Sequence, residues 1–304
     1  MKIFITGGAG FIGSVLTKSL LDNGHSITIY DSLVNSSENN AKKLQKLNAN
    51  FICGDIIDLE HLSQSISGHD ICIHLAGQTD VLNSIKNPDQ NNLVNITGTK
   101  NLLDACVKHN VDVIAASSAA VYEDSNEILS ETSSSKPNSP YGKSKLIMEQ
   151  LLIDTSELSE INCQSLRMFN VYGKDQNIKY AGVITKFLEN IKNENDLIIF
   201  GDGTSSRDFV SVYDVIDSII LAIHKIKGKK GEICNIASGT STKIIELAEM
   251  MIAITGKNSI SIKYSPSKTG EIINSQADIS RARDTLGYSP KISLREGLEQ
   301  LINS

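Results

Sequence analysis

The sequence has no Trp and few aromatic residues of any kind: eight Tyr and seven Phe among 304 residues. It therefore offers little material for a surface on which successive nucleic-acid bases stack, or for the aromatic belt of a membrane protein. It also lacks an excess of basic residues, with 29 Lys and Arg against 35 Asp and Glu and a net charge of −6. Because binding to a phosphate backbone favours a basic surface, we expect neither a nucleic acid nor a membrane as a partner.

Paired cysteines and clustered metal ligands are missing as well. The cysteine number is odd, no two form a C-x-x-C pair, and the six His residues show no ligand spacing, so we expect buried thiols in a reducing compartment and no protein-held metal. No apolar run is long enough for a membrane span. Met1–Ile5 leads directly into glycines instead of the apolar core of a signal peptide, which predicts a cytoplasmic protein. The five cysteines are Cys53, Cys72, Cys106, Cys163 and Cys234.

The length and composition are those of an ordinary globular protein. Apolar residues make up 40% of the chain and charged residues 21%, and a chain of this length buries a core without disulfide or metal staples. At about 150 residues per domain, the length indicates two domains, or one large domain with an appended lobe.

Short apolar runs alternate with amphipathic segments through the first half of the chain. This alternation predicts right-handed βαβ units and a parallel sheet covered on both faces: a Rossmann-type doubly wound α/β domain over residues 1–167. The expected strands are 2–5, 26–30, 49–53, 70–75, 112–116 and 163–167, and the expected helices are 11–21, 39–47, 61–66, 93–109 and 140–157.

The alternation stops after Arg167. Residues 170–182 are polar and are expected to be irregular, followed by a helix at 183–191, a strand at 197–200 and a glycine-rich turn at 201–203. We interpret residues 168–304 as a smaller α+β lobe that carries substrate contacts, with some segments returning to the sheet.

A glycine-rich segment, Thr6–Gly13, connects the first expected strand to the first helix. It fits G-x-x-G-x-x-G at Gly7, Gly10 and Gly13, and G-x-G-x-x-G when counted from Gly8. Glycine permits a tight turn, close approach of the backbone to a pyrophosphate, and close packing of helix on strand, while the helix N-terminus attracts phosphate charge. Between a strand and a helix, the segment predicts a dinucleotide site more strongly than a turn without a ligand.

A carboxylate at the end of the second strand selects between the two nicotinamide cofactors. Asp31 follows Gly13 by 18 residues, and no basic residue occurs after it before Lys42. A carboxylate here accepts hydrogen bonds from a ribose 2′-hydroxyl and repels a 2′-phosphate, which favours NAD over NADP. Asp55 and Ile56, after the third strand, are expected near the adenine, although an Asp in this place often only caps a turn.

The segment Tyr141-Gly142-Lys143-Ser144-Lys145 places a phenol and an ammonium on one face of the long helix. For Tyr141 to accept a proton near neutral pH its pKa must fall from about 10 to about 7, which costs roughly 4 kcal/mol. The Lys145 ammonium and an oxidised nicotinamide are two positive charges that would lower it. If this spacing occurred alone, Tyr141 and Lys145 would be interpreted as an ordinary Tyr–Lys pair on the surface of a helix.

The match is not isolated, because Ser117 and Ser118 follow the fifth strand, at the sheet edge where such folds bind ligands. Ser118 is placed to bind the same substrate oxygen as Tyr141. Together these elements resemble the extended short-chain dehydrogenase/reductase family, the NAD-dependent nucleotide-sugar epimerases and dehydratases, over nearly the whole chain. Further matching segments are 74–77, 95–99, 139–140, 166–173, 201–203 and 207–210.

The resemblance implies the residues of each site. It implies Ser118, Tyr141 and Lys145 as catalytic residues. For NAD it implies Gly7, Gly10, Phe11, Ile12, Gly13, Asp31, Asp55, Ile56, Leu75, Ala76, Gly77, Asn95, Ser117, Tyr141 and Lys145. For the nucleotide sugar it implies Ser118, Tyr141, Asn170, Val183, Phe200, Arg207, Lys268, Glu271 and Ser275.

Several of the nucleotide-sugar contacts have specific implied roles. Asn170 and Arg207 would contact the diphosphate, Phe200 the base and Glu271 the nucleotide ribose. Lys268 stands where the family usually has an Arg, which keeps the charge but loses the bidentate fork. The alternative for Arg207 is a local ion pair with one of two nearby carboxylates, Asp202 and Asp208.

The residues after Ser118 bear on the reaction. The resemblance leads us to expect an acidic pair there in 4,6-dehydratases and a Glu in decarboxylases, whereas this chain has Ala119 and Ala120. Neither can act as a second acid or base, which favours C4 epimerisation. Glu123 lies further on and is interpreted as a solvated loop residue. In the 4-epimerases that the chain resembles, the residue aligned with Ser275 controls the room around the sugar's 2-substituent. With a small Ser there, the resemblance implies that UDP-N-acetylhexosamines are accepted beside UDP-glucose and UDP-galactose.

Two other functions remain open at this stage. One is a different reaction of the same family, by a nucleotide-sugar reductase or dehydratase. The other is a non-catalytic NAD-binding regulator, for which a broken Ser, Tyr and Lys set would be the mark, yet all three are present. By resemblance we also expect a homodimer formed through the helices at 93–109 and 140–157, because four such helices pack as a bundle.

Overall fold

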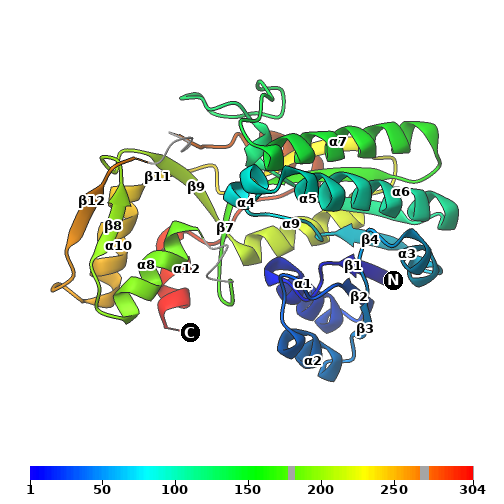
Figure 1. Ribbon diagram of the computed structural model, residues 1–304, viewed down its shortest axis with the longest axis horizontal. Helices are drawn as coiled ribbons and strands as arrows, with labels where there is room; N and C mark the ends of the chain where they lie inside the picture. Colours follow the sequence, from blue (N-terminus) through cyan, green and yellow to red (C-terminus); the bar gives the residue numbers. More distant parts are fainter. Residues whose placement is uncertain (177–181, 268–273, 304) are drawn as a thin grey trace. The chain divides into compact units, whose positions relative to one another are not determined.

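The computed structural model describes residues 1–176, 182–267 and 274–303 (Figure 1). The chain forms two compact units. Unit 1 comprises Met1–Val121, Ser135–Arg167 and Ile216–Cys234, and unit 2 comprises Tyr122–Ser134, Met168–Val215 and Asn235–Ser304. One passage between the units falls between residues 167 and 168. Residues 122–134 and 216–234 make further crossings, so a single boundary does not describe the chain.

Unit 1 is built on a seven-stranded sheet of order β10-β6-β5-β4-β1-β2-β3. Pairs β1·β2, β1·β4, β2·β3 and β4·β5 are parallel, and the fold is the expected doubly wound one. The chain leaves β1 toward β2 and β3 on one side and resumes at β4 on the other, which creates a switch point at the carboxyl ends of β1 and β4. The strands are β1 Lys2–Thr6, β2 Ser26–Asp31, β3 Asn50–Cys53, β4 Ile71–His74, β5 Asp112–Ser118, β6 Cys163–Met168 and β10 Lys230–Ile236.

The helices of unit 1 follow the strands in sequence. They are α1 Phe11–Asp22, α2 Glu38–Lys46, α3 Leu59–Ile66, α4 Val81–Lys86, α5 Pro88–Asn92, the π-helical turn η1 Leu93–Thr97, α6 Gly98–His109, the 3₁₀ turn η2 Ala119–Val121 and α7 Pro140–Leu158, with α9 Val212–Lys225 entering from unit 2. Helices α5, α6 and α7 lie side by side (Figure 1). Side-chain caps fix the starts of α2, α3, α4 and α7, at Ser37, Asp58, Asp80 and Ser139.

The core of unit 1 combines side chains from the sheet and from the helices that cover it. Phe4, Leu62, Leu102 and Leu152 are fully buried in one cluster, and burying each such side chain contributes about 1.5–3 kcal/mol. Four cysteines are buried, and Cys53, at the end of β3, is exposed, so the expectation of a buried thiol is wrong there. All five are free of disulfides.

The expected single helix over residues 93–109 is wrong in its first turn. Leu93–Thr97 forms a π-helix, and only Gly98–His109 is α-helical. The two short helices before it, α4 and α5, have six and five residues and are too short to show a periodic apolar pattern.

Unit 2 contains a three-stranded sheet of order β11-β9-β7 and a two-stranded parallel pair, β12-β8. Phe187, Leu197, Leu247, Met251 and Leu298 are buried together in its core. The segment 170–182 was expected to be irregular, but it begins with a strand, because residues 170–172 pair in parallel with β9. The elements are β7 Asn170–Tyr172, α8 Val183–Lys192, β8 Leu197–Phe200, β9 Ser206–Ser211, β11 Ser241–Lys243, α10 Ile244–Thr255, β12 Ile262–Ser265, α11 Ser280–Leu286 and α12 Leu294–Ile302.

Among the described residues, no helix is both long and apolar enough to cross a bilayer. The same part of the chain holds no cluster of three or more His, Cys, Asp or Glu side chains arranged for a metal ion.

Candidate active site

The N-terminus of α7 packs closely against the segment that follows β5. Ser139 caps the helix by accepting a hydrogen bond from the backbone N–H of Gly142, at 3.0 Å. A Cβ on Gly142 would overlap the carbonyl oxygen of Ala120 and lie 2.7 Å from the Cβ of Pro137. Glycine therefore permits the close approach that brings Tyr141 beside Ser118, where the two side chains are hydrogen-bonded.

Burial and Ser118 act on Tyr141 in opposite directions. Burial of the phenol raises the pKa of Tyr141, and the hydrogen bond with Ser118 lowers it. Burial prevails, so in the absence of a further positive charge the phenol keeps its proton at neutral pH. The Ser118 Oγ also accepts the backbone N–H of Ala120 at 3.1 Å, which orients the hydroxyl.

Lys145 lies one turn along α7 from Tyr141 and is buried. Its Nζ donates a hydrogen bond to the carbonyl oxygen of Ala116 in β5, at 2.7 Å. Burial lowers the pKa of Lys145 to about 8, against an opposing effect of the Glu149 carboxylate. The ammonium is therefore mostly charged at neutral pH and loses its charge in mildly alkaline solution.

His74 at the end of β4 is held by two threonines. Its ring nitrogens lie 2.8 Å from the Thr6 Oγ1 and 3.0 Å from the Thr99 Oγ1. Burial, assisted by the charge of Lys145, lowers the pKa of His74 to about 3. The ring is therefore neutral at physiological pH and adds no charge beside Lys145.

The glycine-rich turn after β1 forms a cradle that side chains would fill. Gly7 has a φ of +69°, and a Cβ there would lie 2.7 Å from the backbone nitrogen of Ala76. A Cβ on Gly13 would overlap the Gly7 carbonyl oxygen and lie 2.6 Å from the Gly8 Cα. Gly10 is the N-cap of α1 and has no side chain to cover the first-turn N–H groups of Phe11, Ile12 and Gly13. This helix terminus is therefore suited to a pyrophosphate.

Asp31, at the end of β2, is already engaged with the loops around it. One carboxylate oxygen accepts the N–H of Ala9 at 3.0 Å, and the other accepts the N–H of Leu33 at 2.9 Å and the hydroxyl of Ser36 at 2.7 Å. A carboxylate has about four acceptor positions, which leaves capacity for a ribose hydroxyl. The glycine cradle and this carboxylate together fit an NAD.

The remaining residues expected at the cofactor divide into two groups. Leu75, Ala76 and Gly77 follow β4 at the switch point, where the Ala76 N–H donates to the Thr6 Oγ1 at 3.3 Å. A Cβ on Gly77 would lie 3.7 Å from the Lys145 Nζ, so this segment adjoins Lys145.

Other residues in that set are buried or hydrogen-bonded within the protein. Asp55 accepts the N–H of Ile57 at 3.2 Å, which is the turn-capping alternative, and Ile56 is buried. Asn95 of η1 accepts the N–H of Gln78 at 2.8 Å and donates to the Ser144 Oγ at 3.0 Å. The Ser117 hydroxyl donates to Glu149.

Apart from Ser118 and Tyr141, which lie in unit 1, the residues expected at the nucleotide sugar belong to unit 2. Asn170 in β7 is paired with β9, the strand that carries Arg207, and donates to the Asp208 carbonyl oxygen at 3.1 Å. Arg207 donates to the carbonyl oxygen of Ser206 at 2.8 Å. Val183 begins α8, and Phe200 ends β8 with 37% of its surface exposed. Lys268 and Glu271 lie outside the described residues.

Ser275 is buried in a segment that is held on both sides. Two residues that follow it exchange backbone hydrogen bonds with Leu129: the Leu129 N–H donates to the carbonyl of Gln276 at 2.8 Å, and the Asp278 N–H donates to the carbonyl of Leu129 at 2.9 Å. The buried Asp208 carboxylate accepts the N–H of Ala277 at 3.1 Å. These contacts fix the backbone next to Ser275.

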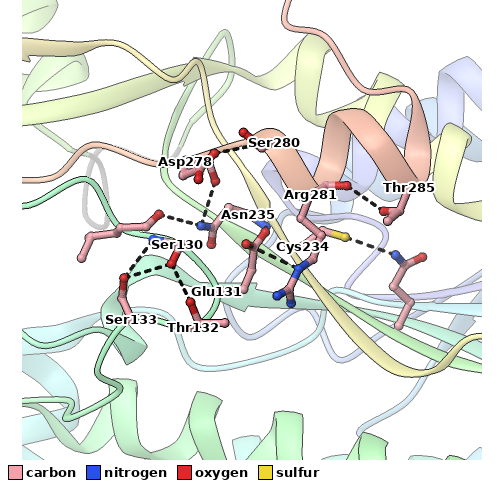
Figure 2. A network of polar contacts seen from close by, with 12 residues as sticks. Ser130, Glu131, Thr132, Ser133, Cys234, Asn235, Asp278, Ser280, Arg281 and Thr285 are labelled. Atoms are coloured by element: carbon pink, nitrogen blue, oxygen red, sulfur yellow. Dashed lines mark hydrogen bonds and ion pairs between the residues drawn. The ribbon is translucent and has the colours of Figure 1, made fainter.

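Asn235 links the segment around Leu129 to the segment around Asp278 (Figure 2). Its amide donates to the carbonyl oxygens of Leu129 and Asp278, at 2.9 and 3.2 Å, and its N–H donates to Glu131 at 2.7 Å. The Tyr122 hydroxyl donates to the Asn235 side chain at 2.6 Å. Sequence reasoning missed Asn235, because its partners are remote in the chain.

Sequence reasoning also missed a buried ion pair next to Lys145. Arg167 donates to both carboxylate oxygens of Glu149, at 2.8 and 2.7 Å. The available signal was the spacing of Glu149, four residues after Lys145 and eight after Tyr141, which places all three on one face of the helix.

The chain is similar to known proteins over nearly its full length. The family "NAD dependent epimerase/dehydratase" matches residues 3–237. A putative UDP-glucose 4-epimerase of Methanocaldococcus jannaschii is 36% identical over 99% of this chain and 97% of its own. A UDP-N-acetyl-α-D-glucosaminuronate decarboxylase of Bacillus cytotoxicus is 31% identical over 99% of this chain and 96% of its own.

Two solved structures are similar over nearly all of both chains. A UDP-glucose 4-epimerase of Thermotoga maritima with UDP-glucose has a TM-score of 0.93 at 33% identity, covering 100% of this chain and 98% of its own. A UDP-N-acetylglucosamine 4-epimerase of Methanobrevibacter ruminantium, in complex with UDP-N-acetylmuramic acid, has a TM-score of 0.93 at 32% identity, covering 99% and 97%. With the glycine cradle and Asp31, the family match identifies NAD as the cofactor.

The cradle can be tested by adding one methyl group. Gly13→Ala places a Cβ against backbone atoms that cannot rotate away, so NAD affinity should fall at least about tenfold, or about 1.4 kcal/mol, measured by calorimetry on cofactor-stripped protein. The matched control is Gly182→Ala, where a Cβ meets open space and affinity should be unchanged. Equal affinity in the two variants would contradict the assignment.

Proposed function

The chain belongs to the NAD-dependent epimerase/dehydratase family, and on that premise we propose that it is a 4-epimerase that interconverts UDP-glucose and UDP-galactose through a transient 4-keto sugar. The observation that carries the proposal is the composition of the segment after Ser118. The turn η2, Ala119–Val121, begins directly after Ser118 and consists of Ala, Ala and Val. It supplies no acid for expelling a hydroxyl and no base for a second proton abstraction, so reversal of the first step is the simplest completion.

In the proposed reaction Tyr141 removes the proton of the sugar 4-hydroxyl. Ser118 is hydrogen-bonded to Tyr141 and would bind the same sugar oxygen. Lys145 places a positive charge one turn away, which opposes the effect of burial on the phenol. NAD, when bound, supplies the acceptor for a hydride from C4 and returns it. After the 4-keto sugar has turned its other face toward the cofactor and the hydride has returned to C4, Tyr141 gives the proton back to the 4-oxygen.

Recognition of the nucleotide is assigned to unit 2. Asn170 and Arg207 lie on neighbouring strands of one small sheet, which suits two donors for a diphosphate, and Arg forms bidentate, charge-assisted hydrogen bonds with such groups. In this proposal the UDP stays bound while the sugar rotates. Most of the binding energy should therefore come from contacts with the nucleotide, and little from contacts with the hexose.

The second candidate is a dehydratase or reductase of the same family, and Glu123 is the residue that could favour it. Its backbone N–H donates to the carbonyl of Ser134 at 3.1 Å. This hydrogen bond joins the two ends of the loop formed by residues 122–134. Glu123→Gln separates the candidates, because an epimerase should keep its activity and a dehydratase that uses this acid should lose it.

The proposed reaction predicts a product of unchanged mass. UDP-glucose incubated with the holoenzyme should yield UDP-galactose without added oxidant, as followed by chromatography and mass spectrometry. Tyr141→Phe should lower turnover by about 10²–10⁴-fold, the usual contribution of a general acid–base group, with NAD content unchanged. Loss of water or of two hydrogens from the sugar would indicate the second candidate, and undiminished activity of Tyr141→Phe would refute the mechanism.

The size of residue 275 predicts the tolerance for N-acetyl groups. Ser275 is small and buried, so we expect turnover of both the UDP-hexose pair and the UDP-N-acetylhexosamine pair. Ser275→Tyr should lower kcat/KM for the N-acetylated pair at least about tenfold and leave the plain pair largely unaffected. Ser275→Ala, which adds no volume, is the control. Wild-type inactivity on the N-acetylated pair would contradict this part of the proposal.

A second copy of the chain is the proposed partner of the α4–α7 face in unit 1. Val81, Leu82 and Ile85 of α4 are exposed, as are Leu93 of η1 and Ile147 of α7. A neighbouring hollow of about 480 Å³ is lined by Lys136, Pro137, Asn138, Lys143, Leu146 and Ile147. Exposed apolar side chains on adjoining helices are typical of a protein interface. The four-helix bundle expected from the sequence, formed by residues 93–109 and 140–157 of two copies, would include Leu93 and Ile147.

The dimer is tested by one charge in this face. Ile147→Arg should convert the dimer to a monomer in light scattering after size exclusion, because a buried unpaired charge at an interface costs on the order of several kcal/mol. The control on the same helix is Leu158→Arg, at a position 88% exposed at the far end of α7. A monomeric wild type, or a dimeric Ile147→Arg variant, would contradict the proposal.

A further inference from the structure

Three consecutive residues of β5 bind three residues of α7 spaced four apart. Ser118 is hydrogen-bonded to Tyr141, Ala116 accepts from Lys145, and the Ser117 hydroxyl donates to Glu149. The first two contacts belong to the proposed catalytic set. The third continues the same row by one helical turn and ends on a carboxylate to which no role has been assigned.

Glu149 is among the most buried charged groups of the protein, with 1% of its surface exposed. Arg167, 3% exposed, donates to its two oxygens from Nε and Nη2. Taking two charges out of water costs on the order of several kcal/mol per ion, and well-packed apolar residues of similar volume often give equal or greater stability. Stability alone is therefore a weak reason for this pair, whereas its place next to Lys145 offers a functional one.

We propose that Glu149 is a positioning residue for Lys145: its carboxylate, fixed by Arg167 and Ser117, keeps the buried ammonium charged and directed at β5, and so acts on Tyr141 through Lys145. The inference rests on the proposed function, because it concerns the cation that assists proton transfer at Tyr141.

Among the groups around Lys145, Glu149 is the one whose charge opposes the effect of burial on the Lys145 pKa. Tyr141, on the same helix, is neutral when protonated. His74, from β4, is neutral because its pKa is about 3. Arg167, from β6, is bound to Glu149, and of these two charges it is the carboxylate that raises the pKa of Lys145. Asn95, from η1 beside Gly77, carries no charge.

The direction of the effect follows from these charges. Burial lowers the pKa of Lys145 to about 8, and Glu149 raises it. Without the carboxylate the pKa falls further, so a larger share of Lys145 is neutral at pH 7 to 8. A neutral amine places no positive charge near Tyr141 for the proposed proton transfer, and the alkaline limb of the activity profile moves to lower pH.

The test measures Lys145 directly in the NAD-bound enzyme. With lysine labelled by ¹³C at Cε, the Lys145 signal is identified by its absence in Lys145→Met, and its titration midpoint is compared in wild type and Glu149→Gln. We expect the midpoint to fall by at least about one pH unit, a tenfold change in proton affinity, with a parallel shift in the alkaline limb of kcat. An unchanged midpoint in the folded variant overturns the proposal.

Two further variants separate electrostatics from folding. Glu149→Gln with Arg167→Met removes the ion pair as a unit, and its Lys145 midpoint should also fall, which decides the question if the single variant does not fold. Asp112→Asn removes another buried carboxylate of β5, four residues or about 13 Å along the strand from Ala116, and should leave the midpoint unchanged. Lower stability of both Glu149 variants with an unmoved midpoint would show a purely structural role and overturn the proposal.

The titration needs no substrate, so it distinguishes this inference from the proposed function. A shifted midpoint in an enzyme that does not act on UDP-hexoses would refute the proposed function alone. Full epimerase activity with an unmoved midpoint would refute the role of Glu149 alone.

Discussion

The close packing of α7 on the end of β5 is the contact on which the site in unit 1 depends. Gly142 lets the first turn of the helix meet the backbone at Ala120. Three residues of α7 spaced four apart, Tyr141, Lys145 and Glu149, then reach β5. The spacing of a helix and the rise of a strand then determine which groups meet. Tyr141 is adjacent to Ser118, and Lys145 donates to Ala116, because both elements are rigid and joined at one end by a contact that admits no side chain.

This packing also sets the electrostatics. A site buried enough to raise the pKa of Tyr141 lowers the pKa of Lys145 for the same reason, because both groups become harder to ionise away from water. Burial therefore acts against the charged forms of both residues. The Glu149 carboxylate, one turn further along α7, raises the pKa of Lys145 and so opposes the effect of burial. The buried charge of Glu149 is in turn paired with Arg167. The charges of Lys145 and Glu149 in α7 and of Arg167 in β6 thus alternate in sign, and each offsets its neighbour.

Sequence reasoning found what is encoded locally. The strands and the glycine turn have signatures within a dozen residues, and the spacing of Tyr141 and Lys145 is fixed by the period of one helix. It missed what depends on tertiary partners: Arg167 is 18 residues from Glu149, and Asn235 is 106 residues from Leu129. The π-helical turn at Leu93–Thr97 was hidden for a related reason, since the contacts of Asn95 with Gln78 and Ser144 come from other segments.

The division of the chain into two units gives the proposed reaction a simple logic. The groups that would carry out proton transfer and hold NAD all belong to unit 1, and the donors proposed for the nucleotide belong to unit 2. If the nucleotide supplies most of the binding energy, the hexose needs few fixed contacts. A loosely held 4-keto sugar can then present either face to the same hydride donor. A site that bound the hexose tightly in one orientation would stabilise one epimer and slow the return from the other. The apolar turn after Ser118 agrees with this requirement, because it offers the sugar no charged group to hold.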